Sequence, residues 1–144
     1  MALASLNVQV GITEKALMQI INEICCSNLC LQELSFTPGS HSIGPLHTLF
    51  VAACTAARKP GILMRNHLAK LVLNHFSNEI FYAVRLPDLI LISCHLRVSI
   101  KTSVEDFATQ LAAISTCVKG WPASPVYIGG DMNTGFGLPF DDVA

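Results

Sequence analysis

Apolar and polar positions along the chain repeat with two periods, one typical of strands and the other of helices. Residues 3–10 are mainly apolar and predict a first strand. Apolar residues recur at helical spacing over residues 14–26, and Thr13 is the expected N-cap. Residues 28–33 predict a short strand, whereas the Pro, Gly and Ser of residues 34–45 predict a loop. The first third of the chain therefore has the order strand, helix, strand, loop.

Short apolar runs dominate the middle of the chain. Residues 46–58 fit a helix or a strand equally well, and the pattern leaves both open. The runs that follow are rich in β-branched and aromatic residues or alternate like strands. They predict four strands, at residues 61–65, 68–76, 79–86 and 88–96.

The clearest helical pattern opens at Ser103, with Asp106 at the capping-box position, and ends near Lys119 and Gly120. Residues 125–134 then predict a last strand. No internal repeat or low-complexity linker interrupts this order. The pattern predicts a layered α/β (α+β) sandwich, with residues 1–144 forming one domain.

Composition shows that the chain is unusually apolar. Charged residues make up 13% of the sequence, about half the usual share of ~25%, and the mean hydropathy is +0.50. The longest apolar stretch, residues 86–96, is too short to span a membrane and contains Pro, Asp and His. Residues 1–12 lack the positive charge of a secretory signal. We therefore expect no membrane association and no secretion.

The cysteines lack the spacing of a zinc site and lie in apolar contexts. Buried thiols in a reducing compartment are the favoured interpretation, with disulfides as the alternative. We expect an intracellular protein, and the sequence does not separate nucleus from cytoplasm. The six residues are Cys25, Cys26, Cys30, Cys54, Cys94 and Cys117.

The charge balance is close to neutral, with nine Lys and Arg against ten Asp and Glu. No basic stripe indicates a nucleic-acid footprint. The cluster of Arg58, Lys59, Arg65 and Lys70 predicts a solvated face, with contact to a phosphate backbone as the alternative.

Polar residues end four otherwise apolar strands, at Asn7, Gln32 with Glu33, His95, and Asp131 with Asn133. A carboxylate at the end of a buried strand is costly unless it is hydrogen-bonded, paired or bound to a cation. If the fold brings the two acids together, they form an oxygen-rich pocket suited to Mg²⁺ beside a phosphate. Each residue also has a structural interpretation: a turn for Asp131, a solvated strand end for Glu33 and a core histidine for His95.

The segments that carry these residues resemble the endonuclease/exonuclease/phosphatase superfamily, which has the deoxyribonuclease I-like fold. The resemblance extends from Asn7 to Asn133. Its strongest part is the series "LQE", "HL" and "GDMN", with a helix between the last two. In order, the segments are "LNVQ", "LCLQEL", "GILMR", "LILISCHL" and "VYIGGDMNT".

The resemblance implies a role for each residue. Glu33 matches the carboxylate that binds Mg²⁺ (or Mn²⁺), and Asn7 the neighbouring amide. Asp131 matches the acid that orients or deprotonates the attacking water. Asn133 matches the amide that hydrogen-bonds the phosphate, and His95 a histidine near the scissile phosphate.

The chain departs from this family at its end. The family has a further Asp and an Asp-His pair late in a longer domain, whereas residues 134–144 contain no histidine. The resemblance therefore implies an incomplete second half and leaves independent catalysis open. An incomplete sandwich predicts an uncovered apolar inner sheet face, and with it self-association or a missing C-terminal half.

The function implied is that of a metal-dependent phosphoester hydrolase-like domain with nucleic acid as substrate, an endonuclease-like phosphodiesterase. Two alternatives stay open at this point. One is a phosphatase acting on inositol phosphates or another small phosphoester, and the other is an inactive remnant or binding module.

Overall fold

The computed structural model describes residues 3–8, 12–24, 27–96 and 104–131. These residues form nine strands and three helices. Their bounds are β1 (Leu3–Asn7), α1 (Glu14–Glu23), β2 (Asn28–Leu34), β3 (Gly39–Ile43), β4 (His47–Val51), β5 (Lys59–Arg65), α2 (Asn66–Ala69), β6 (Asn74–Ser77), β7 (Phe81–Leu86), β8 (Leu89–His95), α3 (Val104–Lys119) and β9 (Val126–Asp131).

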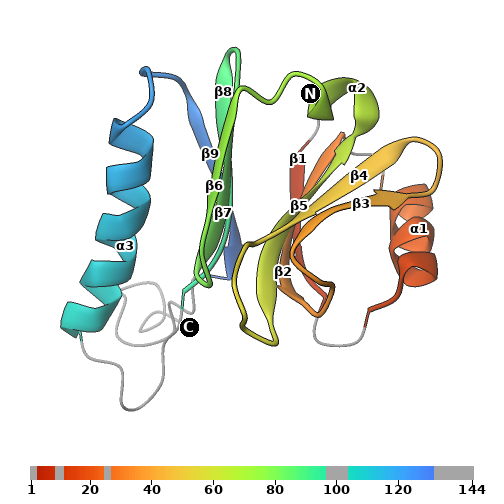
Figure 1. The fold of residues 1–144 in the computed structure, drawn as a ribbon, viewed down its shortest axis with the longest axis horizontal. Coiled ribbons are helices and arrows are strands. Elements are labelled where there is room, and N and C mark those ends of the chain that lie inside the picture. The colour runs from red at the N-terminus through yellow and green to blue at the C-terminus, as the bar shows by residue number, and fades with distance from the viewer. Residues whose placement is uncertain (1–2, 9–11, 25–26, 97–103, 132–144) are drawn as a thin grey trace, which may run out of the picture.

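The elements form four layers, in the order α3, sheet, sheet, α1 (Figure 1). The first sheet has the strand order β1-β2-β5-β4-β3, and the second has the order β6-β7-β8-β9. Strands β1 and β2 are parallel, as are β8 and β9, while the other neighbouring strands are antiparallel. The layered α/β sandwich predicted from the sequence is therefore confirmed.

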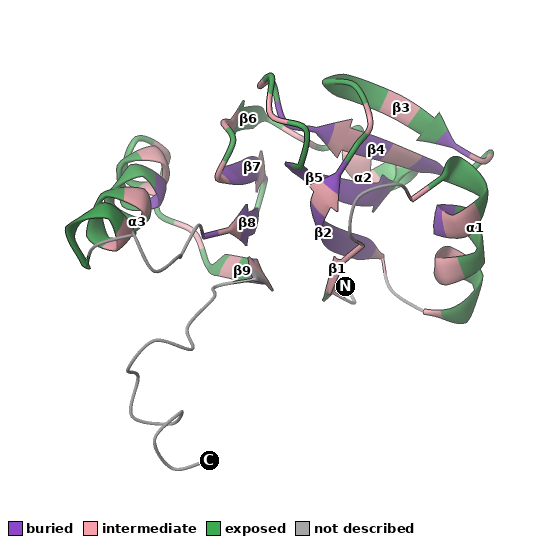
Figure 2. Ribbon diagram, turned by 90° about the horizontal axis from the view of Figure 1, so that it is seen from below, coloured by how far each residue is buried: buried purple, intermediate pink, exposed green. Residues whose placement is uncertain are grey.

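The layers follow from the alternation of side chains along the central strands, because successive residues of a strand point to opposite faces. On β2, Leu29 and Leu31 pack in the core beneath α1, and Cys30 packs between the two sheets. On β8, Ile90 and Ile92 pack beneath α3. The buried residues accordingly gather in the strands, while the outer faces of both long helices are exposed (Figure 2).

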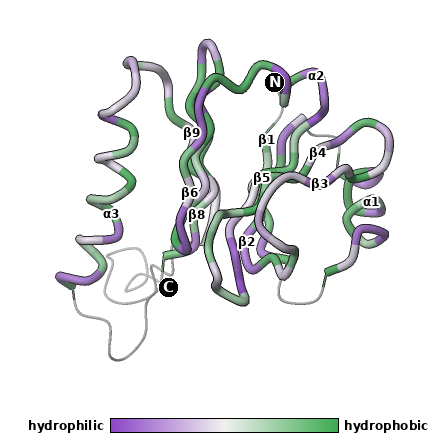
Figure 3. The backbone as a smooth tube through the Cα atoms, in the orientation of Figure 1, coloured by the Kyte–Doolittle hydropathy of each residue, from purple (hydrophilic) through white to green (hydrophobic). Residues whose placement is uncertain are grey.

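The apolar surface is not where the sequence predicted it. The inner sheet faces cover each other, because Ile62 and Met64 on one sheet and Tyr82 and Val84 on the other are all buried in one core. The expectation of an uncovered inner face is therefore wrong. The apolar character of the central strands β2, β5, β7 and β8 reflects burial on both faces, whereas the edge strands β3 and β6 are more polar and largely exposed (Figure 3). Exposed large apolar side chains lie instead on the outer surface. Those on α3 and β9 are Val104, Leu111, Val126 and Ile128, and others are Met18, Leu46, Leu71, Leu73 and Phe76.

The first helix begins where the sequence predicted. Thr13 has extended backbone angles, and its Oγ1 accepts a hydrogen bond from the backbone N–H of Ala16 at 3.1 Å. This hydrogen bond satisfies one of the N–H groups that have no partner within the helix. The helix ends at Glu23, earlier than predicted, because Ile24 leaves helical geometry. The predicted cap at Ser103 lies outside the described residues.

Three predictions in the middle of the chain are resolved or corrected. The predicted loop 34–45 contains the edge strand β3, whose exposed polar residues gave no apolar signal. The ambiguous segment 46–58 contains strand β4 and no helix. The predicted strand 68–76 is wrong in its first half, because residues 66–69 form α2. A short apolar run does not distinguish helix from strand by itself.

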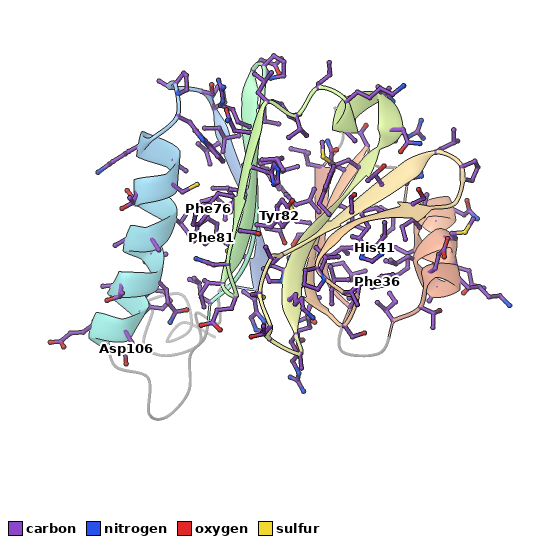
Figure 4. The ribbon with its side chains drawn as sticks, viewed as in Figure 1. Phe36, His41, Phe76, Phe81, Tyr82 and Asp106 are labelled. Atoms are coloured by element: carbon purple, nitrogen blue, oxygen red, sulfur yellow. The ribbon has the colours of Figure 1, made fainter. Side chains whose placement is uncertain are left out.

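Tyr82 lies between the two sheets (Figure 4) and is 4% exposed. Its hydroxyl is hydrogen-bonded to His75 Nδ1 at 3.2 Å. Burial raises the pKa of Tyr82 from 10.0 to about 12, so the folded state favours the neutral phenol. This contribution to stability is complete below pH 10 and is lost as the pH rises from 10 to about 12.

We therefore expect the wild-type protein to lose about 1 kcal/mol more stability than Tyr82→Phe between about pH 8 and pH 11. Phe cannot ionise, whereas the phenol must stay neutral in the folded state. Urea unfolding of both proteins at the two pH values measures the difference. An equal loss in the two proteins would contradict this account.

The remaining findings concern membranes and thiols. In the part of the chain described, no helix is long and apolar enough to cross a membrane. None of the four described cysteines, Cys30, Cys54, Cys94 and Cys117, is in a disulfide. Cys30 and Cys94 are buried, as predicted, whereas Cys54 and Cys117 are partly exposed.

Candidate active site

Strands β2 and β8 lie against each other across the sandwich and run in the same direction. Gln32 Nε2 donates hydrogen bonds to Ser93 Oγ at 3.2 Å and to Ser5 Oγ at 3.3 Å. Ser93 Oγ in turn donates to the carbonyl of Leu31 at 2.8 Å. Gln32 and Ser93 are buried, so this network joins β1, β2 and β8 in a region closed to water.

This arrangement brings the ends of four strands to the same side of the molecule, at the lower side of Figure 1. The hydrogen-bonded residues are Ser5 on β1, Gln32 on β2 and Ser93 on β8. Asn7, Glu33 and His95 follow them on the same three strands, each by one or two residues. Asp131 is the register partner of His95 on β9. The backbone thus places four of the five predicted residues at one end of both sheets, and Asn133 lies outside the described residues.

Two glycines let β9 reach this position. A Cβ on Gly129 would lie 3.0 Å from the Ser5 Cβ and 3.1 Å from the Cys30 Cβ, so a larger residue would require these neighbours in the first sheet to shift by a few tenths of an ångström. Gly130 has a φ of 149°, and a Cβ there would collide with the backbone of Cys94 on β8. The Gly-Gly pair therefore carries the chain to Asp131 through close backbone contacts.

Glu33 sits in a β-bulge at the end of β2. The register with β5 shifts between Leu31 and Leu34, so Gln32 and Glu33 together face the single residue Pro60. Glu33 has a φ of 60°, which is uncommon outside glycine and costs on the order of 1–3 kcal/mol. Bulges next to functional sites redirect side chains. The local backbone at Glu33 is thus held in a strained conformation by its surroundings.

Glu33 forms an ion pair that the sequence did not predict. Arg58 Nη1 lies 2.8 Å from Glu33 Oε1, and the Glu33 side chain is only 12% exposed while that of Arg58 is 63% exposed. Glu33 is therefore not a solvated strand end. A carboxylate this far buried needs a positive partner, and Arg58 supplies one.

A cleft of about 540 Å³ lies beside this ion pair. It is lined by residues 55–58, by Lys59 and Pro60 at the start of β5, and by Glu79 and His95. Arg58 and His95 bring positive or ionisable groups to the cleft. The predicted solvated basic face is wrong for Lys59, which is 7% exposed. The cleft is polar and large enough to hold part of a phosphoester chain.

The donor set at the strand ends fits a divalent cation. Among the side chains that the structure describes, no group of three His, Cys, Asp and Glu could hold a metal ion. Mg²⁺, however, keeps several waters and is usually held by one or two carboxylates. Glu33 supplies a carboxylate that already pairs with the cationic side chain of Arg58, and Asn7 supplies an amide on the neighbouring strand. Oxygen donors of this kind are those that Mg²⁺ and Mn²⁺ prefer.

Removing the hydroxyl of Ser93 should loosen the junction behind these residues. We expect Ser93→Ala to lower the free energy of unfolding by about 1–3 kcal/mol, because the buried Gln32 amide loses one acceptor and the Leu31 carbonyl loses its side-chain donor. Ser40→Ala, on the exposed strand β3, is the matched control and should change stability little. Urea unfolding of both variants measures the effects, and equal losses would contradict the role of the network.

The sequence indicated Gln32 as a polar strand end and Arg58 as part of a basic cluster, but it did not predict the contacts that these two residues make. Gln32 was visible within "LQE", but only the structure shows that it joins the two sheets. Arg58 lies in the basic run directly before β5, and its partner Glu33 is 25 residues earlier in the chain. No local pattern connects residues at that separation.

Comparisons with known proteins identify the fold. No protein-family model matches the sequence, and no curated protein matches it. Truncated TDP2 from Caenorhabditis elegans is similar in structure, with a TM-score of 0.56 and 18% identity, covering 91% of this chain and 57% of that chain. The endonuclease domain of TRAS1, a telomere-specific non-LTR retrotransposon, has a TM-score of 0.57 and 15% identity, covering 88% and 58%.

Humanized D. rerio TDP2, carrying 14 mutations, has a TM-score of 0.60 and 18% identity, covering 96% of this chain and 67% of that chain. The similarity therefore includes nearly all of this chain. The chain itself spans less than two thirds of the C. elegans TDP2 and TRAS1 chains. The predicted fold is confirmed: the chain has the deoxyribonuclease I-like fold of these structures, over a part of their length.

Proposed function

We propose that the chain is a metal-dependent phosphoester hydrolase-like domain that acts on nucleic acid. The observation that carries this proposal is the convergence of Asn7, Glu33, His95 and Asp131 at the ends of four strands from two sheets. Ligand sites in sheet proteins gather at such strand ends. The polar cleft beside Arg58 and His95 gives an extended phosphoester a place to lie.

The choice of nucleic acid rests on the comparison with TRAS1, whose domain is described as an endonuclease. The fold alone does not define a substrate. A net charge of −1 gives no long-range attraction for nucleic acid, so we expect weak binding that depends on a few local contacts.

The proposed roles follow the chemistry of each side chain. Asp131 orients the attacking water and accepts its proton, and Asn133 donates a hydrogen bond to the phosphate. His95 lines the cleft and stabilises charge at the phosphate or its leaving group. Glu33 and Asn7 hold Mg²⁺ or Mn²⁺, which as a Lewis acid polarises the phosphoryl oxygens when bound.

Incubating the purified chain with single-stranded DNA, duplex DNA, RNA and bis(p-nitrophenyl) phosphate tests the proposal. We expect cleavage of at least one of these diesters with Mg²⁺ or Mn²⁺, and none with EDTA. Phosphate release from an inositol phosphate without diester cleavage would favour the small-phosphoester alternative. Absence of hydrolysis from every substrate at high protein concentration would favour the inactive binding module.

A further inference from the structure

Arg58 connects the predicted metal ligand with the cleft. Its guanidinium pairs with Glu33 at 2.8 Å. The same residue lines the cleft that contains His95, whereas Glu33 is not among the residues that line it. A single cation therefore touches both the carboxylate and the space in which a phosphoester would lie.

The two side chains of this ion pair differ in their exposure to solvent. The Glu33 side chain is 12% exposed and sits on a strained backbone, whereas the Arg58 side chain is 63% exposed. An exposed arginine has several accessible rotamers, and ion pairs with one solvated partner contribute little stability. Arg58 can therefore leave Glu33 at small cost, provided that another cation compensates the carboxylate.

A divalent cation and Arg58 compete for the same carboxylate charge. If Mg²⁺ or Mn²⁺ takes that charge, the guanidinium is released beside the cleft. Arginine is well suited to bind phosphate there, because its planar donors match two phosphate oxygens at once. Lys59, the next residue, is 7% exposed and has less room to turn.

We propose that Arg58 is a phosphate-binding residue of the cleft. Glu33 pairs with the Arg58 guanidinium until a divalent cation binds the Glu33 carboxylate and releases Arg58. The metal and the phosphate chain then bind cooperatively, because each removes a competitor for the other. This inference rests on the proposed function, since it assigns Arg58 to the same site. It does not require the chain to hydrolyse the phosphoester.

The first test measures binding without metal. A short fluorescein-labelled oligothymidylate is titrated in EDTA and followed by fluorescence anisotropy at several salt concentrations. We expect Glu33→Gln to bind about 3–10-fold more tightly than wild type, because Arg58 is free. We expect Arg58→Gln to bind about 3–10-fold more weakly than Glu33→Gln, with a salt slope smaller by about 0.7–0.9.

The second test measures Mn²⁺ binding without nucleic acid, through the electron paramagnetic resonance signal of free Mn²⁺. Arg58→Gln should bind Mn²⁺ several-fold more tightly than wild type, since no guanidinium competes for Glu33. Arg85→Gln is the matched control. Arg85 lies on β7, donates to Asn74 Oδ1 at 2.9 and 2.6 Å, and does not line the cleft. It should behave as wild type in both tests.

The exchange is supported if Arg58→Gln binds Mn²⁺ more tightly than wild type and binds oligothymidylate more weakly than Glu33→Gln. Weaker Mn²⁺ binding by Arg58→Gln than by wild type, with cooperative unfolding retained, would show that Arg58 only supports the fold around Glu33 and would overturn the proposal. A Mn²⁺ affinity equal to that of wild type, or an oligothymidylate affinity equal to that of Glu33→Gln, would overturn it as well. Both tests measure binding alone, so the supporting result without any phosphodiester cleavage would disprove the catalytic function while leaving the exchange intact.

Discussion

Replacing Glu33 with Gln is expected to lower Mg²⁺-dependent phosphodiester cleavage by at least about 100-fold. Gln keeps the size of the side chain but removes the negative charge that would hold the cation. Glu33 is largely buried at the end of β2, and no other carboxylate that the structure describes is placed with it in a metal-binding group. The loss is measured as initial cleavage rate against Mg²⁺ concentration, on the substrate that the wild-type protein cleaves.

The dependence of the cleavage rate on Mg²⁺ concentration distinguishes a loss of metal binding from a loss of activation of the attacking water. If Glu33 holds the metal, Glu33→Gln should need far more Mg²⁺ to recover activity, while its unfolding transition stays cooperative. Asp131→Asn should lower the rate by a similar factor without raising the Mg²⁺ requirement as strongly, because we assign it to the attacking water. Glu23→Gln at the exposed end of α1 is the control for loss of one charge. Full activity in either site variant would refute its assigned role.

The second large effect concerns the approach of β9 to the site. Gly130→Ala should lower the free energy of unfolding by about 3 kcal/mol, of which about 1 comes from the positive φ and about 2 from the collision with the Cys94 backbone. Because β9 is pinned to β8 there, the strand cannot move aside without breaking its ladder.

Gly39→Ala is a close control for this prediction. Gly39 also has a positive φ, of 112°, but a Cβ there would meet no atom within 4 Å. We expect a loss of about 1 kcal/mol, from backbone strain alone. Urea unfolding followed by Trp121 fluorescence compares the two variants, and equal losses would show that the contact with Cys94 is not what requires glycine at position 130.

Local signals were sufficient for much of the secondary structure. The cap at Thr13 and the apolar stripe behind it predicted the start of α1, because both depend on residues within one helical turn. The edge strand β3 escaped prediction because it is polar and is held by pairing with β4. The run at 68–76 was assigned to the wrong class at its start, since short apolar runs suit both helices and strands.

The residues of the candidate site were also predicted from local signals, whereas their backbone geometry was not. Asn7, Glu33, His95 and Asp131 were found from the sequence because polar residues at the ends of apolar strands are visible without a structure, and because they match a family pattern. The strained bulge at Glu33 was not visible. It depends on the register with β5, which follows from pairing between distant segments.

By itself, the sequence determined the alternation of strands and helices and the polar residues that end the strands. Both are local properties, set by side-chain period and capping. Only the tertiary structure decided that these ends meet, through buried hydrogen bonds from Gln32 to Ser5 and Ser93. It also decided that Arg58 pairs with Glu33. Such contacts depend on how two sheets pack, and many sequence patterns are compatible with the same packing.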